Sequence, residues 1–299
     1  MPLPEKTLDA IVAGDANVDL LLTGAKQLVD GKELLIAGAS LTLGGSSGIT
    51  AFNLARLGAK VGFVGYVGDD LFGRFVRERL ASAGIHMAQL RTVAAPKSGI
   101  TVWATNGAFK AGLTYTGTIA MLQAKDVTSA YLSRARHLHV GAYFLQTKLH
   151  RGAPALFRRA RRLGLTTSLD GNWDDSEKWD SNIRATLAHT DIFFPNEDEA
   201  LRMTKRKSVL AAAEALAEFA RVVVVKRGGR GALVYGKLGY LEIPARKTRV
   251  VDTTGAGDSF NAGFLEAYLR GEDLAVCAKA GIAAGARAVS KVGGTTAFE

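Results

Sequence analysis

The chain has 299 residues, enough for one large domain or two modest ones, and we predict one domain over residues 1–299. Its composition, 47% hydrophobic and 22% charged, is ordinary for a globular protein. No apolar run approaches the roughly 20 residues that cross a bilayer, so a membrane protein is excluded. The net charge of +10 permits a polyanion partner, but the four arginines between residues 158 and 162 lack the interleaved aromatic residues that stack on bases. A solvated helix explains these arginines better, and nucleic-acid binding stays an alternative.

Short β-branched runs alternate along the chain with longer stretches of helical periodicity. Strands are predicted at residues 8–14, 60–67, 137–141, 165–170, 191–194 and 221–226, and helices at 46–57, 71–83, 149–163, 183–189, 208–219, 255–269 and 274–289. Ser46 or Ser47 is the predicted N-cap of the first helix, and Gly58 its end. Strands separated by helices predict an α/β fold: a mostly parallel sheet covered on both faces, in three layers α/β/α.

Two glycine-containing segments interrupt this alternation. Residues 20–43 and 100–117 have strand-like alternation and no good helical pattern. We interpret them as a small β-sheet lid, built from two excursions of the main domain at about residues 16–43 and 97–118. Exposed apolar alternation in such edge strands needs a cover, so we expect a homodimer that forms through the lid.

The strongest chemical signal is Asp252-Thr253-Thr254-Gly255-Ala256-Gly257-Asp258-Ser259-Phe260, which opens a helix. Small residues let the backbone approach a ligand, and the free N–H groups of a helix start bind anions. A carboxylate beside a bound phosphate suits a general base for an attacking hydroxyl. From the residues alone, a glycine-rich helix start with Asp258 as a capping residue is equally consistent.

This segment resembles the signature of the ribokinase-like, or PfkB, carbohydrate kinases, and other matches follow in order along almost the whole chain. The resemblance implies an ATP-dependent kinase with a ribokinase-like fold. It implies that Asp258 is the catalytic base and that Gly255, Ala256 and Gly257 form the anion hole. Family members also often bind a monovalent cation such as K⁺ at the positions of Asp252 and Thr254.

A second match, Gly44-Gly45-Ser46-Ser47-Gly48 continuing to Asn53, is similar to the amino-terminal signature of the family. The resemblance implies that this turn contacts the substrate, with Gly44, Gly45, Ser47 and Asn53 as candidates. Ile49 stands where an asparagine usually binds substrate hydroxyls, which makes ribose a poor candidate. In Gly14-Asp15-Ala16-Asn17-Val18-Asp19, the resemblance assigns hydroxyl recognition to Asp19 with Asn17 beside it.

Two further matches concern the nucleotide and its metal. Asn196 and Glu199 fit an Asn-x-x-Glu element, whose oxygens can hold the water shell of Mg²⁺. Without the family, an acidic first turn favoured by the helix dipole is the simpler reading. The turn from Lys226 to Gly231, with Gly228 inside it, resembles the nucleotide-binding turn of the family. Lys226 or Arg227 could reach the ATP phosphates, or both could be solvated. The resemblance adds Asn196, Gly255 and Gly257 to the nucleotide-binding residues. Asp170-Gly171-Asn172 resembles an Asp-Pro-Asn segment of the family.

The acceptor is not settled by these motifs. Relatives that take phosphorylated sugars tend to carry lysine where this chain has Phe194, so we predict an unphosphorylated sugar or sugar acid. A nucleoside is the alternative, with Phe109, Tyr115 and Ile49 as an apolar slot. A non-catalytic binding protein on the same fold is a further alternative. The single cysteine, Cys277, fits a reducing cytoplasm.

Overall fold

The computed structural model describes residues 6–25, 31, 33–106 and 109–299, without the side chains of residues 109 and 110. Its centre is a mostly parallel sheet. In the described part of the chain this sheet has nine strands, which lie in the order β13-β12-β11-β10-β9-β8-β1-β4-β5. Their bounds are β13 Gly239–Ile243, β12 Ala232–Gly236, β11 Val222–Lys226, β10 Ile192–Phe193, β9 Thr166–Leu169, β8 Ala135–Val140, β1 Leu8–Ala13, β4 Val61–Gly68 and β5 His86–Val93.

Neighbouring strands from β11 across to β5 run parallel, whereas β12 and β13 form an antiparallel edge. The strands β1, β8 and β11 are buried on both faces. Burial on both faces explains their continuous apolar runs, because helices cover the two sides of a parallel sheet. Their carboxyl ends lie at one edge of the sheet, where ligands of open α/β sheets bind.

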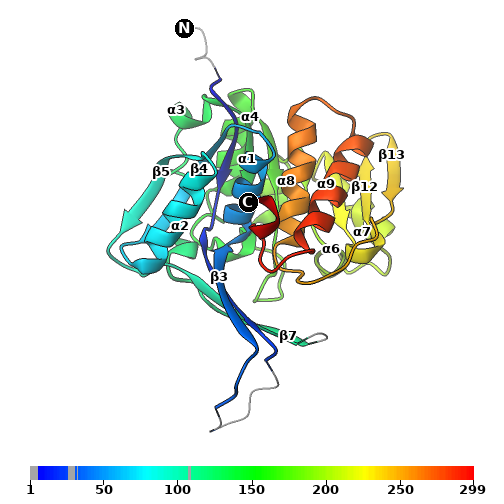
Figure 1. Cartoon of the computed structure of the whole chain (residues 1–299). Coiled ribbons are helices and arrows are strands. Elements are labelled where there is room, and N and C mark those ends of the chain that lie inside the picture. The colour runs from blue at the N-terminus through cyan, green and yellow to red at the C-terminus, as the bar shows by residue number, and fades with distance from the viewer. Residues whose placement is uncertain (1–5, 26–30, 32, 107–108) are drawn as a thin grey trace.

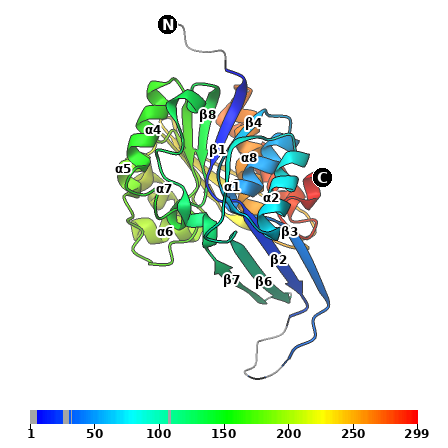
Figure 2. The same ribbon diagram turned by 90° about the vertical axis from the view of Figure 1, so that its left-hand side faces the viewer.

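Helices form a layer on each face of the sheet (Figures 1 and 2). One layer holds α3 Ser129–Leu132, α4 Ala153–Arg162, α5 Ile183–Leu187, α6 Glu197–Thr204 and α7 Val209–Ala217. The other holds α1 Ser46–Arg56, α2 Leu71–Ser82, α8 Ala256–Leu269 and α9 Leu274–Ala288. Each layer packs against the sheet and forms its own buried apolar cluster, which contains Phe157 in the first layer and Phe52 and Phe264 in the second. The molecule therefore has the three-layer α/β/α fold that the sequence predicts.

A smaller sheet lies beyond the carboxyl edge of the central sheet, at the bottom of Figure 1. Its strands lie in the order β3-β2-β6-β7, with bounds β3 Gly38–Gly44, β2 Asn17–Thr23, β6 Ile100–Asn106 and β7 Phe109–Tyr115. The pair β2 and β6 is parallel, and the two outer pairs are antiparallel. Segments far apart in sequence thus build one small sheet beside the carboxyl edge of the central sheet.

The helices and strands differ from the sequence-based prediction at a few places. The prediction of Ser46 or Ser47 as N-cap is wrong: Gly45 is the N-cap of α1, and no side chain caps the helix from that position. The prediction also lacks β5, β12, β13 and the short helix α3. None of the helices in the described part of the chain has the length and apolar character needed to span a bilayer.

Candidate active site

A cavity of about 780 Å³ lies where the carboxyl ends of the central strands, the starts of α1 and α8 and the small sheet meet. Of the residues named from sequence, these line it: Asn17, Asp19, Gly45, Ile49, Asn196, Glu199, Lys226, Gly228, Thr254, Gly255, Gly257 and Asp258. They come from five separate stretches of chain. The fold therefore gathers into one place the motifs that the sequence presents separately.

The start of α8 forms one wall of this cavity. Gly255 is its N-cap with φ of 70°, a left-handed conformation that favours glycine. A Cβ at Gly255 would also lie 2.6 Å from the Gly294 Cα atom, so only glycine fits there. The Asp252 carboxylate fixes the preceding turn, because it accepts hydrogen bonds from the Thr254 amide at 3.0 Å and the Gly293 amide at 2.9 Å. The first amides of α8 have no intrahelical partner, which makes this end electropositive.

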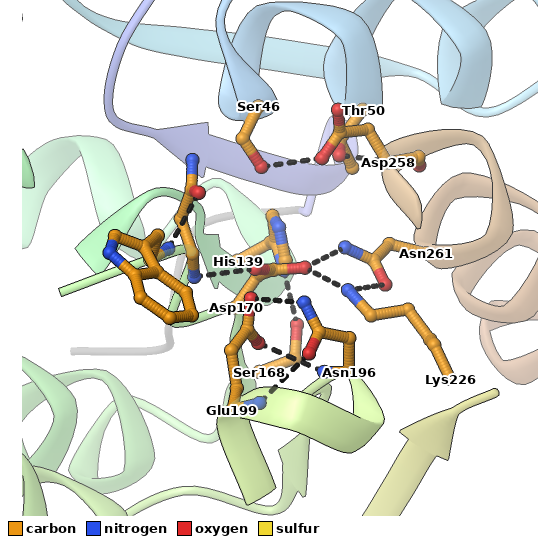
Figure 3. Close-up of polar contacts among 12 residues, drawn as sticks. Ser46, Thr50, His139, Ser168, Asp170, Asn196, Glu199, Lys226, Asp258 and Asn261 are labelled. Carbon is orange, nitrogen blue, oxygen red and sulfur yellow. Dashed lines mark hydrogen bonds and ion pairs between the residues drawn. The ribbon is translucent and has the colours of Figure 1, made fainter. Parts of the chain in front are cut away.

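Asp258 lies in the first turn of α8 and borders the cavity. Ser46 Oγ donates a 2.6 Å hydrogen bond to Asp258 Oδ1 (Figure 3). Burial, and after it the nearby charge of Asp170, raises the pKa of Asp258 to about 7, although Ser46 and Lys226 oppose the rise. A carboxyl with this pKa exchanges protons readily near neutrality, as a general base must.

Lys226, Asp170 and Asn261 form a buried polar cluster next to Asp258 (Figure 3). Lys226 Nζ lies 2.5 Å from Asp170 Oδ2, which also accepts a 2.5 Å hydrogen bond from Asn261 Nδ2. Burial favours neutral forms of both ionised groups, yet their mutual attraction wins, so the pKa of Asp170 is lowered and that of Lys226 is raised. Both groups therefore stay charged at neutral pH.

Asn196 and Glu199 form a capping box at the start of α6. Glu199 Oε2 accepts a hydrogen bond from the Asn196 amide at 2.9 Å, and Glu199 Oε1 accepts one from Asn196 Nδ2 at 2.6 Å. Burial raises the pKa of Glu199 to about 7, with a further contribution from the Asp170 charge. The pair thus has a structural role that the residues alone favoured, and it also borders the cavity.

The opposite wall carries a set of polar groups at the end of β1 and in β2. The buried Asp15 carboxylate accepts hydrogen bonds from the backbone amides of Ser46 and Ser47 at 3.0 and 2.9 Å. It therefore caps α1 although it lies far from that helix in sequence. Asp19 and Asn17 border the cavity. A Cβ at Gly44 would lie 2.2 Å from Asp19 Oδ1, so this glycine leaves room for the carboxylate.

Several residues named from sequence lie outside the cavity lining: Gly44, Ser47, Asn53, Gly231, Asp252 and Ala256. Asn53 is fully buried, and its Nδ2 donates to Ser259 Oγ at 2.9 Å and to the Gly294 carbonyl at 3.0 Å. Ser47 is fully buried as well. A Cβ at Gly231 would lie 1.9 Å from the Ile243 carbonyl, which assigns that glycine to packing. We therefore withdraw Asn53 and Ser47 as substrate contacts.

The structure also adds residues that sequence reasoning did not single out as site residues. Asp15, Asp170 and Trp103 border the cavity, and Asn261 holds Asp170 from the second turn of α8. Asp170 had a sequence signal, since it is the last residue of a predicted strand and opens the Asp-Gly-Asn segment. Trp103 had none, because its approach to the cavity depends on the pairing of β6 with β2 and β7.

The sequence offers Phe109, Tyr115 and Ile49 as an apolar slot for a nucleoside, and the described part of the structure places one of them at the cavity. Ile49 borders the cavity, but Tyr115 does not and is half exposed. Phe109 belongs to β7, and its side chain lies outside the described part of the structure. Trp103 offers a cavity-facing aromatic ring in their place. A Cβ at Gly112 on the neighbouring strand would lie 2.6 Å from that ring, so the ring lies across this glycine.

A helix start next to a partly buried carboxylate, at the carboxyl edge of a mostly parallel sheet, is typical of α/β enzymes that act on phosphorylated ligands. The model of the pfkB family carbohydrate kinases matches residues 7–299. The chain is 28% identical to 5-dehydro-2-deoxygluconokinase of Lacticaseibacillus casei, over 99% of this chain and 94% of the relative. It is 31% identical to nucleoside kinase of Methanothermobacter thermautotrophicus, over 79% and 74% of the two chains.

The fold is similar to that of a putative ribokinase II from E. coli, solved in complex with ATP and Mg²⁺, with a TM-score of 0.86 at 22% identity over 98% of this chain and 96% of the other. The chain belongs to the pfkB family of carbohydrate kinases. It is a kinase, a phosphotransferase with an alcohol group as acceptor. The prediction of the family, the fold and the class of enzyme is thereby confirmed.

Proposed function

We propose that this kinase transfers the γ-phosphoryl group of ATP to a hydroxyl of a small unphosphorylated sugar or sugar acid. The observation that carries the proposal is the position of Asp258 at the start of α8, bordering the cavity with a pKa of about 7. Asp19 and Asn17 border the same cavity and supply the acceptor and donor groups that bind sugar hydroxyls. The solved relative with ATP and Mg²⁺ supports ATP as the donor.

In the proposed reaction the Asp258 carboxylate takes the proton of the acceptor hydroxyl while its oxygen attacks the γ-phosphorus in line. The bond from that phosphorus to the ADP oxygen breaks at the same time. The backbone amides of Gly255, Ala256 and Gly257 would stabilise the charge that develops on the phosphoryl oxygens. Gly228 and Lys226 both border the cavity, and we assign them to the binding of ATP.

The residues present fit a magnesium ion. Mg²⁺ prefers oxygen ligands and keeps several waters, so it needs few protein oxygens besides the phosphates. Glu199 is the carboxylate at the cavity that we assign to its water shell, with Asn196 beside it. When bound, the ion neutralises charge on the phosphates. Among the described residues no group of three or more acidic, cysteine or histidine side chains could hold a metal ion.

A monovalent cation is a separate proposal. The Asp252 carboxylate already accepts bonds from the Thr254 hydroxyl at 2.8 Å and from two backbone amides. We propose that K⁺ binds by this turn and supports the start of α8. Activity in potassium chloride above that in sodium chloride at equal ionic strength is the expected result, and equal activity would remove the cation from the account.

A nucleoside is the second candidate acceptor, and one observation favours it. The Trp103 ring borders the cavity, and an aromatic ring there can stack on a base. The similarity to a nucleoside kinase points the same way. The buried Phe194 occupies the position where lysine is typical of kinases for phosphorylated sugars, which supports an acceptor without a phosphate in either case.

An ATP-consumption screen with hexoses, pentoses, sugar acids and nucleosides tests the proposal. We expect stoichiometric ADP and a phosphorylated product with at least one sugar or sugar acid, and weaker turnover with nucleosides. Product from nucleosides alone would favour the second candidate. Binding of these compounds without ADP formation would support a non-catalytic protein.

We also propose a homodimer through the small sheet. Leu113 and Tyr115 on β7 and Leu41 on β3 expose apolar surface, with Leu113 71% exposed. Apolar edge strands favour a partner. Light scattering at micromolar concentration is expected to give twice the monomer mass, and Leu113→Glu is expected to give the monomer. A wild-type monomer would contradict the proposal.

A further inference from the structure

The polar cluster of Lys226, Asp170 and Asn261 joins three elements beside the cavity, which Lys226 and Asp170 border (Figure 3). Lys226 is the last residue of β11, Asp170 directly follows β9, and Asn261 lies in α8. Asp170 Oδ2 accepts hydrogen bonds from Lys226 Nζ and from Asn261 Nδ2, each at 2.5 Å. Asp170 Oδ1 accepts one from the backbone amide of Asn172 at 3.1 Å. Asn261 Oδ1 lies 3.5 Å from Lys226 Nζ. These contacts fix the direction of the ammonium group.

Among the described residues that line the cavity, Lys226 is the one cation. The neighbouring arginines of its turn are engaged elsewhere: Arg227 pairs with Glu242 at 2.6 Å, and Arg230 pairs with Glu197. The resemblance to a nucleotide-binding turn leaves open whether Lys226 or Arg227 points toward the phosphates. The ion pairs favour Lys226.

The Lys226 ammonium lies beside the start of α8. A Cβ added at Gly257 would lie 3.5 Å from Lys226 Nζ, an ordinary contact distance, so the ammonium lies directly beside this turn. A helix amino end is electropositive, and an ammonium beside it is repelled unless negative charge compensates. Asp170 provides that charge in the free protein. The combined positive groups suit an anion that enters between them.

We propose that Lys226 contacts the phosphoryl group in transfer, and that Asp170 and Asn261 are positioning residues that hold its ammonium at the start of α8; this inference rests on the proposed function. Lys226 forms no covalent bond and keeps its proton. The acceptor oxygen gains a bond to the γ-phosphorus, the bond from phosphorus to ADP oxygen breaks, and the acceptor proton passes to Asp258. The ammonium stabilises charge that develops on the phosphoryl oxygens.

The layer below the cluster is polar but uncharged. Ser168 Oγ lies 2.7 Å from His137 Nε2 and 2.8 Å from His139 Nδ1. Burial lowers the pKa of His137 to about 3 and that of His139 to about 4, so both rings are neutral. Asp170 therefore has Lys226 as its cationic partner among these neighbours. A buried carboxylate with one such partner holds that partner tightly.

The proposal is tested by removing the Lys226 amine by mutation and restoring an amine by chemical modification. Lys226→Cys removes the amine, and alkylation of this cysteine with 2-bromoethylamine restores one at nearly the same length. The natural Cys277 is fully buried, and burial raises the pKa of its thiol to about 12, so it resists alkylation. Alkylation with iodoacetamide gives a neutral side chain as the matched control.

We expect Lys226→Cys to lower kcat by about 10²–10³-fold, the loss typical of one group that stabilises transition-state charge. Aminoethylation is expected to recover most of this loss, and iodoacetamide none of it. The same aminoethylation in an Asp170→Asn background should recover little, because the restored amine lacks its positioning partner. Near-wild-type kcat in Lys226→Cys, or equal recovery with iodoacetamide, would overturn the inference.

Asn261→Ala serves as a second variant, since it leaves no buried charge unpaired should Asp170→Asn fail to fold. It is expected to lower kcat about tenfold with a smaller change in KM for ATP, as for one lost hydrogen bond to a charged group. An unchanged kcat would overturn the positioning role. A wild-type protein that phosphorylates no acceptor would refute the proposed function itself, whereas an active wild type with an active Lys226→Cys refutes this inference alone.

Discussion

Ser46 Oγ donates a 2.6 Å hydrogen bond to the carboxylate of Asp258, a residue 212 positions later in the chain. The contact joins the first turn of α1 to the first turn of α8. From sequence, Ser46 or Ser47 is expected to cap its own helix. In the structure the Asp15 carboxylate caps α1 instead, and the Ser46 hydroxyl bonds to Asp258, the proposed catalytic base.

This contact predicts a change in pH dependence. The proposed general base must be ionised to accept a proton, so kcat/KM is expected to fall about tenfold for each unit of pH below the Asp258 pKa of about 7. The Ser46 bond lowers that pKa, so Ser46→Ala should move the acid limb to higher pH. Thr50→Val is the control, because Thr50 Oγ1 bonds the Asp258 backbone carbonyl at 3.3 Å and not its carboxylate. An unmoved limb in Ser46→Ala would contradict the prediction.

The magnesium assignment predicts that Glu199→Gln raises the Mg²⁺ concentration needed for half-maximal activity. Glutamine retains the shape of the capping box but loses the charge that orients magnesium-bound water. Asp198→Asn, at an exposed position of the same turn, removes an equal charge away from the cavity. Magnesium titrations that coincide for wild type and Glu199→Gln would remove Glu199 from the metal site.

The acceptor side predicts a specific effect on substrate affinity. Asp19→Asn should raise KM for the best acceptor about tenfold or more, because a carboxylate that accepts hydroxyl hydrogen bonds is lost. KM for ATP should change little. Asp69→Asn, an exposed acid outside the cavity, is the control.

Ile49 predicts a change in specificity. In the same assay, Ile49→Asn should raise kcat/KM for ribose relative to that for the best acceptor. A wild-type enzyme that prefers ribose would refute the argument from Ile49.

The fully buried Asn53 predicts a change in stability and not in substrate affinity. Its Nδ2 donates to Ser259 and to the Gly294 carbonyl, which ties α1 to α8 and to the carboxyl-terminal turn. Asn53→Ala leaves those acceptors without a donor, at a cost of about 1–3 kcal/mol. Thermal unfolding should show a lower Tm while KM for the acceptor stays the same. A raised KM at unchanged Tm would restore the assignment made from sequence.

Much of the fold could be read from sequence because buried parallel strands carry continuous apolar runs and their helices carry glycine stops. The missed strands have weaker signals. The strand β5 lies at the sheet edge with a half-exposed pattern, and β12 and β13 form an antiparallel hairpin within a chain of parallel units. Edge strands pack on fewer neighbours, so their composition is less constrained.

The site divides in the same way. Asp258 and the glycines around it could be found because one local segment carries the whole helix start. The contacts of Asp258 with Ser46 and of Asp170 with Lys226 and Asn261 join residues from different elements. Such contacts depend on strand order and helix packing, which local patterns do not encode. For Asn53, a position one helical turn from the usual substrate contact proved to face the interior.

The most direct test of the central claim is single-turnover transfer of labelled γ-phosphate from ATP to the best acceptor, in wild type and Asp258→Asn. We expect the variant to be slower by about 10²–10⁴-fold or more. The raised pKa of Asp258 means that its carboxylate costs stability as pH rises from about 4 through about 7. At pH 8 the folded variant should therefore unfold at a temperature no lower than wild type. Transfer at a near-wild-type rate by this folded variant would contradict the account.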